Sequence, residues 1–106
     1  MMNALTQDLD LWEVWVEYDQ FHPDYFGTLY VHGEIFTDRK ANSTLTKIEK
    51  GGYQLSLQLP ARSARSNYTK EVLYSEPIRN LNQYTSVCIY SGDKMVAYFN
   101  NIEIMI

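Results

Sequence analysis

The sequence predicts an all-β protein, an antiparallel β-sandwich of about eight strands that forms a single domain over residues 1–106. Three observations predict this fold class. Apolar and polar residues alternate with a period of two over most of the chain, as in half-buried strands. Turn signals rich in glycine, proline and asparagine separate the alternating runs. Helical spacing is almost absent, so no helices are available to connect parallel neighbours. A small β-barrel is the alternative, although a closed barrel would show cleaner alternation.

The two strands nearest the N-terminus alternate most regularly. In the strand expected over residues 11–18, the inward side chains are Trp12, Val14, Val16 and Tyr18, and the outward ones are Glu13, Trp15 and Glu17. In the strand expected over residues 28–36, the inward positions are Leu29, Val31, Gly33 and Ile35, and the outward ones are Thr28, Tyr30, His32, Glu34 and Phe36. The loop between them contains Pro23 and Gly27, which favour a chain reversal.

The stretch STLTKIEKGGYQLSLQLP predicts a hairpin with a two-residue turn at Gly51-Gly52, because glycine accepts the positive φ of primed turns. Pairing Lys50 with Tyr53 then places Ile48 opposite Leu55. This register puts Lys47 on the outer face of the hairpin, and its lysines indicate a protected edge.

A second hairpin is predicted in YTSVCIYSGDKMVAYFN, with Gly92-Asp93 as its turn. One face is expected to carry Val87, Ile89, Val96 and Tyr98, and the other Cys88, Tyr90, Met95, Ala97 and Phe99. Apolar residues on both faces indicate strands that are covered on both sides.

Two shorter strands complete the prediction. One covers residues 68–75 and is closed by Pro77, and the other is the C-terminal stretch IEIMI, in which Ile102, Ile104 and Ile106 share a face. So apolar a strand should be paired or covered, which favours a place inside a sheet. The alternative is a homodimer formed through this strand.

Composition and charge restrict the partners. A net charge of −4 opposes binding to nucleic acid or to an anionic membrane, and the only basic cluster is Arg62, Arg65 and Lys70. The N-terminal stretch has neither the basic nor the apolar region of a secretory signal, and no apolar run is long enough to span a membrane. With Cys88 as the only cysteine, no internal disulfide can form. The sequence therefore predicts a soluble cytoplasmic protein, unless a leader has been removed.

Catalytic patterns are not found. Serines lack a nucleophile elbow, Cys88 is placed mid-strand, and His32-Gly33-Glu34 lacks the cysteine pair of a zinc deaminase. The paired carboxylates Glu13 and Glu17 lie on one flat strand rather than across a cleft. We therefore expect a non-enzymatic protein without a cofactor.

Metal binding is not expected either. The weak candidates are Asp19, His22 and Asp24 in YDQFHPDY, which could supply oxygen and imidazole ligands. Their spacing matches no defined metal loop, and a polar turn is the simpler interpretation.

The remaining candidate is a binding surface on the outer side of the two N-terminal strands. If these strands are neighbours, an aromatic patch rimmed by acid results, with the loop adding Phe21, Tyr25 and Phe26. Its residues are Trp15, Tyr30, His32, Glu13, Glu17, Glu34, Tyr25 and Phe26. Three interpretations compete: a face covered by other parts of the chain, a protein interface, or a stacking platform for a sugar or flat ligand. We favour a protein-interaction module that binds another protein or a second copy, with a small-ligand or carbohydrate-binding module as the alternative.

Overall fold

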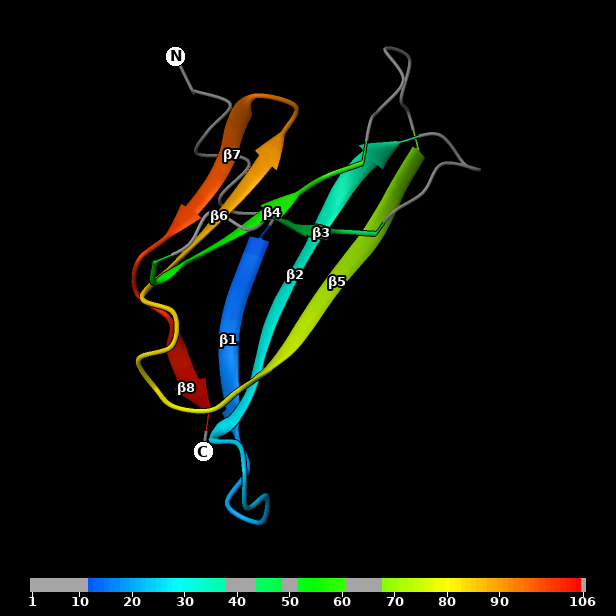
Figure 1. The fold of residues 1–106 in the computed structure, drawn as a ribbon. Helices are drawn as coiled ribbons and strands as arrows, with labels where there is room; N and C mark the ends of the chain where they lie inside the picture. The colour runs from blue at the N-terminus through cyan, green and yellow to red at the C-terminus, as the bar shows by residue number, and fades with distance from the viewer. Residues whose placement is uncertain (1–11, 38–43, 49–51, 61–67, 106) are drawn as a thin grey trace.

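The chain forms a β-sandwich of two four-stranded sheets, which confirms the predicted fold class (Figure 1). The computed structural model describes residues 12–37, 44–48, 52–60 and 68–105. The strands within them are β1 (Trp12–Tyr18), β2 (Gly27–Thr37), β3 (Thr46–Ile48), β4 (Gln54–Gln58), β5 (Tyr68–Ile78), β6 (Ser86–Ser91), β7 (Lys94–Phe99) and β8 (Glu103–Met105). The first sheet has the order β5-β2-β1-β8 and the second β3-β4-β6-β7. The sheets do not close into a barrel.

Each sheet is mixed rather than purely antiparallel. The pairs β1–β8 and β4–β6 are parallel, and the other four pairs are antiparallel. The strand β8 joins β1 at the edge of the first sheet, so its predicted place inside a sheet is wrong. Its outward Met105 is exposed, whereas Ile104 is half-buried against the core.

The core lies between the sheets and is built as the alternation in β1 and β2 predicts. Trp12 and Val16 of β1 are buried, as are Leu29, Val31 and Ile35 of β2. Trp12 pairs with Gly33, and its ring lies directly over this glycine, where a Cβ atom would overlap it.

The predicted register of the β3–β4 hairpin is wrong by one residue. Ile48 lies opposite Ser56 rather than Leu55, and Lys47 lies opposite Leu57. A one-residue shift turns every side chain of the strand to the other face. Lys47 therefore points between the sheets, although β3 is an edge strand as its lysines indicated.

The β6–β7 hairpin has the predicted turn, with Ser91 paired to Lys94 and Gly92 at a φ of 61°. A β-bulge between Ile89 and Tyr90 then shifts the register, so Ala97 lies opposite Ile89 instead of sharing a face with Cys88. Cys88 and Ile89 point to opposite sides of β6 and are both buried, which confirms that this strand is covered on both faces. For β7 the same prediction is wrong, because Met95 and Tyr98 are exposed.

Pro77 lies inside β5 instead of ending it. A proline removes one backbone hydrogen-bond donor, and among the described strands β5 lies at an edge and pairs only with β2. The strand can therefore run on to Ile78 without losing a bond of the ladder.

No helix in the described residues is long and apolar enough to cross a membrane. Arg62 and Arg65 of the basic cluster, and Ile106 of the C-terminal stretch, lie outside the described residues.

Candidate binding face

The order β5-β2-β1-β8 brings the outward side chains of four strands onto one surface. Register partners in these strands point to the same side, so the composition of the surface follows from the pairing. We call it the acidic–aromatic face; its principal residues are Glu13, Trp15, Glu17, Tyr30, His32, Glu34, Glu71, Leu73, Glu103 and Met105.

An aromatic pair lies at the centre of this face. Trp15 and Tyr30 are direct partners across β1 and β2, and their rings stack with centroids 5.3 Å apart and planes inclined by 19°. The indole Nε1 of Trp15 also donates a hydrogen bond of 3.1 Å to Glu17. Both side chains are only half-buried, so the pair is held in place while remaining accessible.

His32 connects three strands beside this pair. Its Nε2 lies 2.9 Å from a carboxylate oxygen of Glu71 on β5, and its Nδ1 lies 3.5 Å from one of Glu13 on β1. Both glutamates are about three-quarters exposed, so their other oxygens face solvent.

The face is strongly acidic. Its glutamates are Glu13, Glu17, Glu34, Glu71 and Glu103, and none of its described residues is a lysine or arginine. The negative charge of these five carboxylates is larger than the net charge of the whole chain, which is −4. Glu34 and Glu71 lie directly opposite each other on β2 and β5, an arrangement of like charges that costs stability.

Apolar side chains lie among these carboxylates. Leu73 is 59% exposed and Met105 is 49% exposed, both high for apolar residues in strands. On the side of β8, a hollow of about 600 Å³ lies next to Trp15 and is lined by Glu13, Val14, Trp15, Phe99, Asn101, Glu103 and Met105. The face therefore offers an aromatic and aliphatic centre within a ring of negative charge.

The loop contributes less to this face than predicted. Phe26 packs against the core and against Tyr18, with ring centroids 4.9 Å apart, so it serves the fold. Tyr25 contacts the ring of His22 at a centroid distance of 4.7 Å.

The three weak metal candidates form a polar turn. Asp19 Oδ1 accepts a hydrogen bond from the backbone N–H of Phe21, and His22 Nδ1 accepts one from that of Asp24. Within the described residues, no three His, Cys, Asp or Glu side chains are grouped so that they could hold a metal ion.

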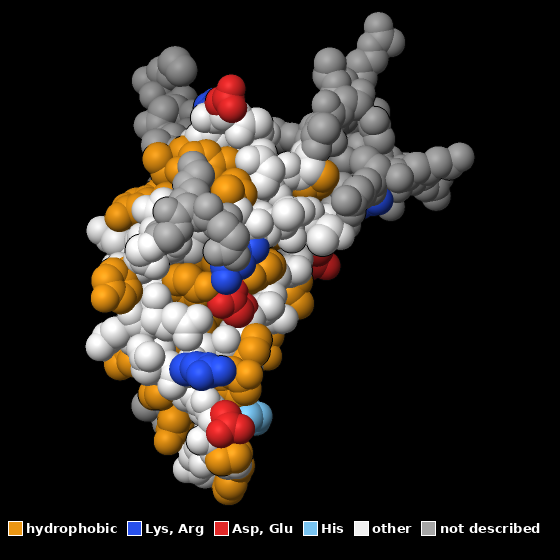
Figure 2. Space-filling model, viewed as in Figure 1, with side chains coloured by type: hydrophobic (Ala, Val, Ile, Leu, Met, Phe, Trp, Pro, Cys, Tyr) orange, Lys and Arg blue, Asp and Glu red, His pale blue; other side chains and the backbone are white. Residues whose placement is uncertain are grey.

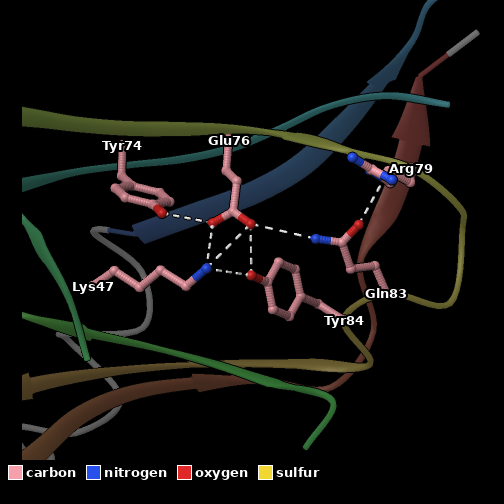
Figure 3. A network of polar contacts seen from close by, with 6 residues as sticks. All are labelled: Lys47, Tyr74, Glu76, Arg79, Gln83 and Tyr84. Carbon is pink, nitrogen blue, oxygen red and sulfur yellow. Dashed lines mark hydrogen bonds and ion pairs between the residues drawn. The ribbon is translucent and has the colours of Figure 1, made fainter. Parts of the chain in front are cut away.

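A second polar cluster lies between the sheets (Figure 3). Glu76 of β5 accepts hydrogen bonds of 2.6 Å from the hydroxyls of Tyr74 and Tyr84. It also accepts one of 3.4 Å from the amide of Gln83 and lies 3.3 Å from the ammonium of Lys47. Lys47 in turn donates a 2.8 Å hydrogen bond to Tyr84.

These contacts set the charge state of the cluster. Burial alone would raise the pKa of Glu76, but hydrogen bonds from the two tyrosines and Lys47 outweigh it and hold that pKa below its usual value. The hydrogen bond to Tyr84, with help from Glu76, raises the pKa of Lys47. The cluster therefore links β5, β3 and the segment 79–85 through charged and hydroxyl groups that contact one another.

Sequence reasoning missed Glu71, Leu73, Glu103 and Met105 on the face, and the whole Glu76 cluster. Glu71 and Leu73 alternate with Val72, which is an outward signal, but nothing local shows that β5 lies beside β2. No known protein family, curated protein or solved structure matches this chain.

Proposed function

We propose that this protein is a non-catalytic interaction module whose acidic–aromatic face binds a basic, partly apolar segment of another protein. The observation that carries the proposal is the stacked pair of Trp15 and Tyr30, accessible at the centre of five glutamates on a face whose described residues include no lysine or arginine. Aromatic side chains are typical anchors of protein interfaces, and surrounding charge selects the partner and speeds its approach.

Charge also decides between a foreign partner and a second copy. Two copies meeting through this face would bring ten carboxylates together without a counter-charge, which disfavours a face-to-face homodimer. The same charge repels phosphate backbones and anionic lipids. A lysine- or arginine-rich protein segment would instead relieve the repulsion between Glu34 and Glu71. We also propose that the protein is cytoplasmic, as expected from the sequence.

The geometry of the aromatic pair favours protein over carbohydrate. A sugar platform presents ring faces side by side in the open. Trp15 and Tyr30 instead face each other across neighbouring strands, so each ring covers one face of the other. We therefore treat sugar binding as an outcome that would refute the proposal.

The test is a titration with a synthetic ten-residue peptide of alternating lysine and leucine, followed by tryptophan fluorescence. We expect saturable binding that weakens at least tenfold between 50 and 300 mM salt, because the attraction is electrostatic. An equally long peptide of alternating glutamate and leucine should not bind.

A matched pair of charge variants locates the site. Glu34→Gln with Glu71→Gln should weaken the lysine peptide several-fold. Asp24→Asn with Asp93→Asn removes the same charge from exposed turns away from the face and should leave affinity nearly unchanged. An equal loss of peptide affinity in the two double variants would show that binding depends on net charge alone and not on this face. Binding of a neutral oligosaccharide in place of the peptide would favour the carbohydrate alternative.

A further inference from the structure

The segment 79–85 and residues 100–104 pass the lower ends of β1, β2 and β5 (Figure 1). A second hollow lies there, between the inner side of the first sheet and these segments. Its volume is about 300 Å³, and its lining residues are Val16, Leu29, Ile78, Leu81, Asn82, Tyr84, Thr85, Asn100, Asn101, Ile102 and Ile104. It is distinct from the acidic–aromatic face, because Val16 and Ile104 point to the opposite side of the first sheet from Trp15 and Met105.

The walls of this hollow belong to the hydrophobic core. Val16, Leu29 and Ile78 are at most 3% exposed and form its deepest part, and Ile102 and Ile104 pack against the same core. Figure 2 shows hydrophobic side chains reaching the surface over the lower half of the molecule, with Lys or Arg and Asp or Glu side chains among them. At about 300 Å³ and open to solvent, the hollow is large enough to receive a small molecule.

The lining also indicates the chemistry of that occupant. None of the described residues that line the hollow is charged. Tyr84, which lines it, donates its hydroxyl to Glu76, and Glu76 is paired with Lys47. A charged ligand would lose its hydration here without gaining a counter-ion.

Polar groups are confined to uncharged side chains at the mouth. Asn82, Asn100 and Asn101 are exposed there, and Thr85 adds a hydroxyl. In the described part of the chain, no hydrogen bond occupies the amide groups of these three asparagines. They offer both donors and acceptors to one or two uncharged polar groups of a ligand.

We propose that this hollow is a binding site for an uncharged, mainly apolar small molecule that carries a hydroxyl, carbonyl or amide group at one end. Its volume is at the lower limit of small-molecule sites, which restricts the ligand to about the size of a two-ring compound. The apolar body would lie against Leu81, Ile102 and Ile104, which are accessible, and the polar end would meet the asparagines.

The test uses two probes of nearly equal shape, the neutral 2-naphthamide and the anionic 2-naphthoate, in titrations followed by amide NMR shifts. We expect one molecule of 2-naphthamide to bind, with shifts centred on residues 81–85 together with Ile102 and Ile104, and 2-naphthoate to bind at least tenfold more weakly. Equal affinity for the two probes, shifts centred on the acidic–aromatic face, or no saturable binding would overturn the proposal.

A matched pair of variants completes the test. Leu81 lines the hollow and is 48% exposed, whereas Met95 lies on β7 away from it and is 44% exposed. Leu81→Asp should weaken 2-naphthamide at least tenfold, and Met95→Asp should leave its affinity unchanged. Both sites tolerate a charge in the folded protein because both are open to solvent. Unchanged affinity in Leu81→Asp, or an equal loss in both variants, would place the probe elsewhere.

Discussion

Trp12 and Trp15 are three residues apart in one strand, and the alternation of β1 gives them different surroundings. Trp12 is 5% exposed and covers Gly33 in the core, whereas Trp15 is half-buried on the outer face and stacks on Tyr30. The first is part of the fold, and the second is available to a partner.

We expect Trp12→Ala to lower the free energy of unfolding by about 3–5 kcal/mol, since it leaves a cavity in the core. Trp15→Ala should cost only about 1 kcal/mol, the contribution of an aromatic pair near the surface, while reducing affinity for the lysine peptide. Urea denaturation of the two variants measures the difference. A loss of several kcal/mol for Trp15→Ala would show that this residue belongs to the core and would contradict the proposed interface.

Glu76 is a carboxylate held charged between the sheets by hydrogen-bond donors. Because its pKa is lowered in the folded protein, its contribution to stability is present above the unfolded value near 4.5 and is lost as the pH falls through the folded pKa. At pH 7, Glu76→Gln should lower the free energy of unfolding by about 1–3 kcal/mol, because it leaves the donors around it imperfectly paired.

The pH series is the specific part of this prediction. The difference between wild type and Glu76→Gln should shrink as the pH is lowered from 7 to about 3, since only the wild type has a carboxylate to protonate. Asp93→Asn, in an exposed turn, serves as the control and should show little pH-dependent difference. A constant difference for Glu76→Gln across this range would mean that the charge of the carboxylate does not contribute.

At the scale of strands, local alternation was a sufficient guide wherever one side of a strand faces the core. In β1 and β2 the predicted inward residues are the buried ones, apart from Val14, which is half-buried, and Tyr18, which is 42% exposed at the end of β1. The β3–β4 hairpin shows the limit of such reasoning. The pair Gly51-Gly52 predicted a two-residue turn. Gly52 has the positive φ that such a turn needs, 73°, but the turn also includes Tyr53.

The additional turn residue, Tyr53, goes with a shift of one residue in the pairing of β3 with β4. With the shifted register, Lys47 faces Glu76 across the sandwich, a pairing that the sequence did not suggest because a lysine inside a sandwich is normally unfavourable. The bulge in β6–β7 had the same effect on Ala97. Registers that depend on a bulge or a turn of uncertain length cannot be settled by alternation alone.

Gly33 provides a prediction at this scale, because it lies in the middle of β2 beneath the ring of Trp12. A Cβ atom here would overlap the indole ring, so Gly33→Ala should lower the free energy of unfolding by about 1–3 kcal/mol, despite the better strand propensity of alanine. The same change in a Trp12→Ala background should cost clearly less, since the ring is no longer there. Equal costs in the two backgrounds would show that backbone strain, rather than contact with Trp12, is responsible.

At the scale of the whole molecule, strand order decides what the candidate face contains. The sequence allowed β1 and β2 to be paired, which assembled Trp15, Tyr30 and His32. It could not show that β5 and β8 flank them, because parallel and distant pairings have no local signature. Glu71 and Glu103, which make the face strongly acidic, were therefore found only in the structure.

This strand order places two carboxylates together, which lowers stability but would favour the binding of a cationic partner. Glu34 and Glu71 face each other on neighbouring strands, and such like-charge pairs cost a fraction of a kcal/mol. Glu71 also contacts His32 at 2.9 Å, so it has a role in linking the strands. The proposed binding face would account for Glu34, because a bound cationic partner would relieve the repulsion. Natural binding sites commonly hold residues that favour function over stability.

We therefore expect Glu34→Gln to raise the free energy of unfolding by about 0.2–1 kcal/mol at low salt, and at the same time to weaken the lysine peptide. The gain should vanish at about 0.5 M salt, because these exposed charges are screened. Glu13→Gln is the control on the same face: Glu13 lies beside His32 rather than opposite another carboxylate, so its removal should bring no gain. Urea denaturation at two salt concentrations gives both values. If Glu34→Gln proves less stable than the wild type at low salt, the carboxylate contributes to the fold, and the opposed pair is no sign of a site kept for a partner.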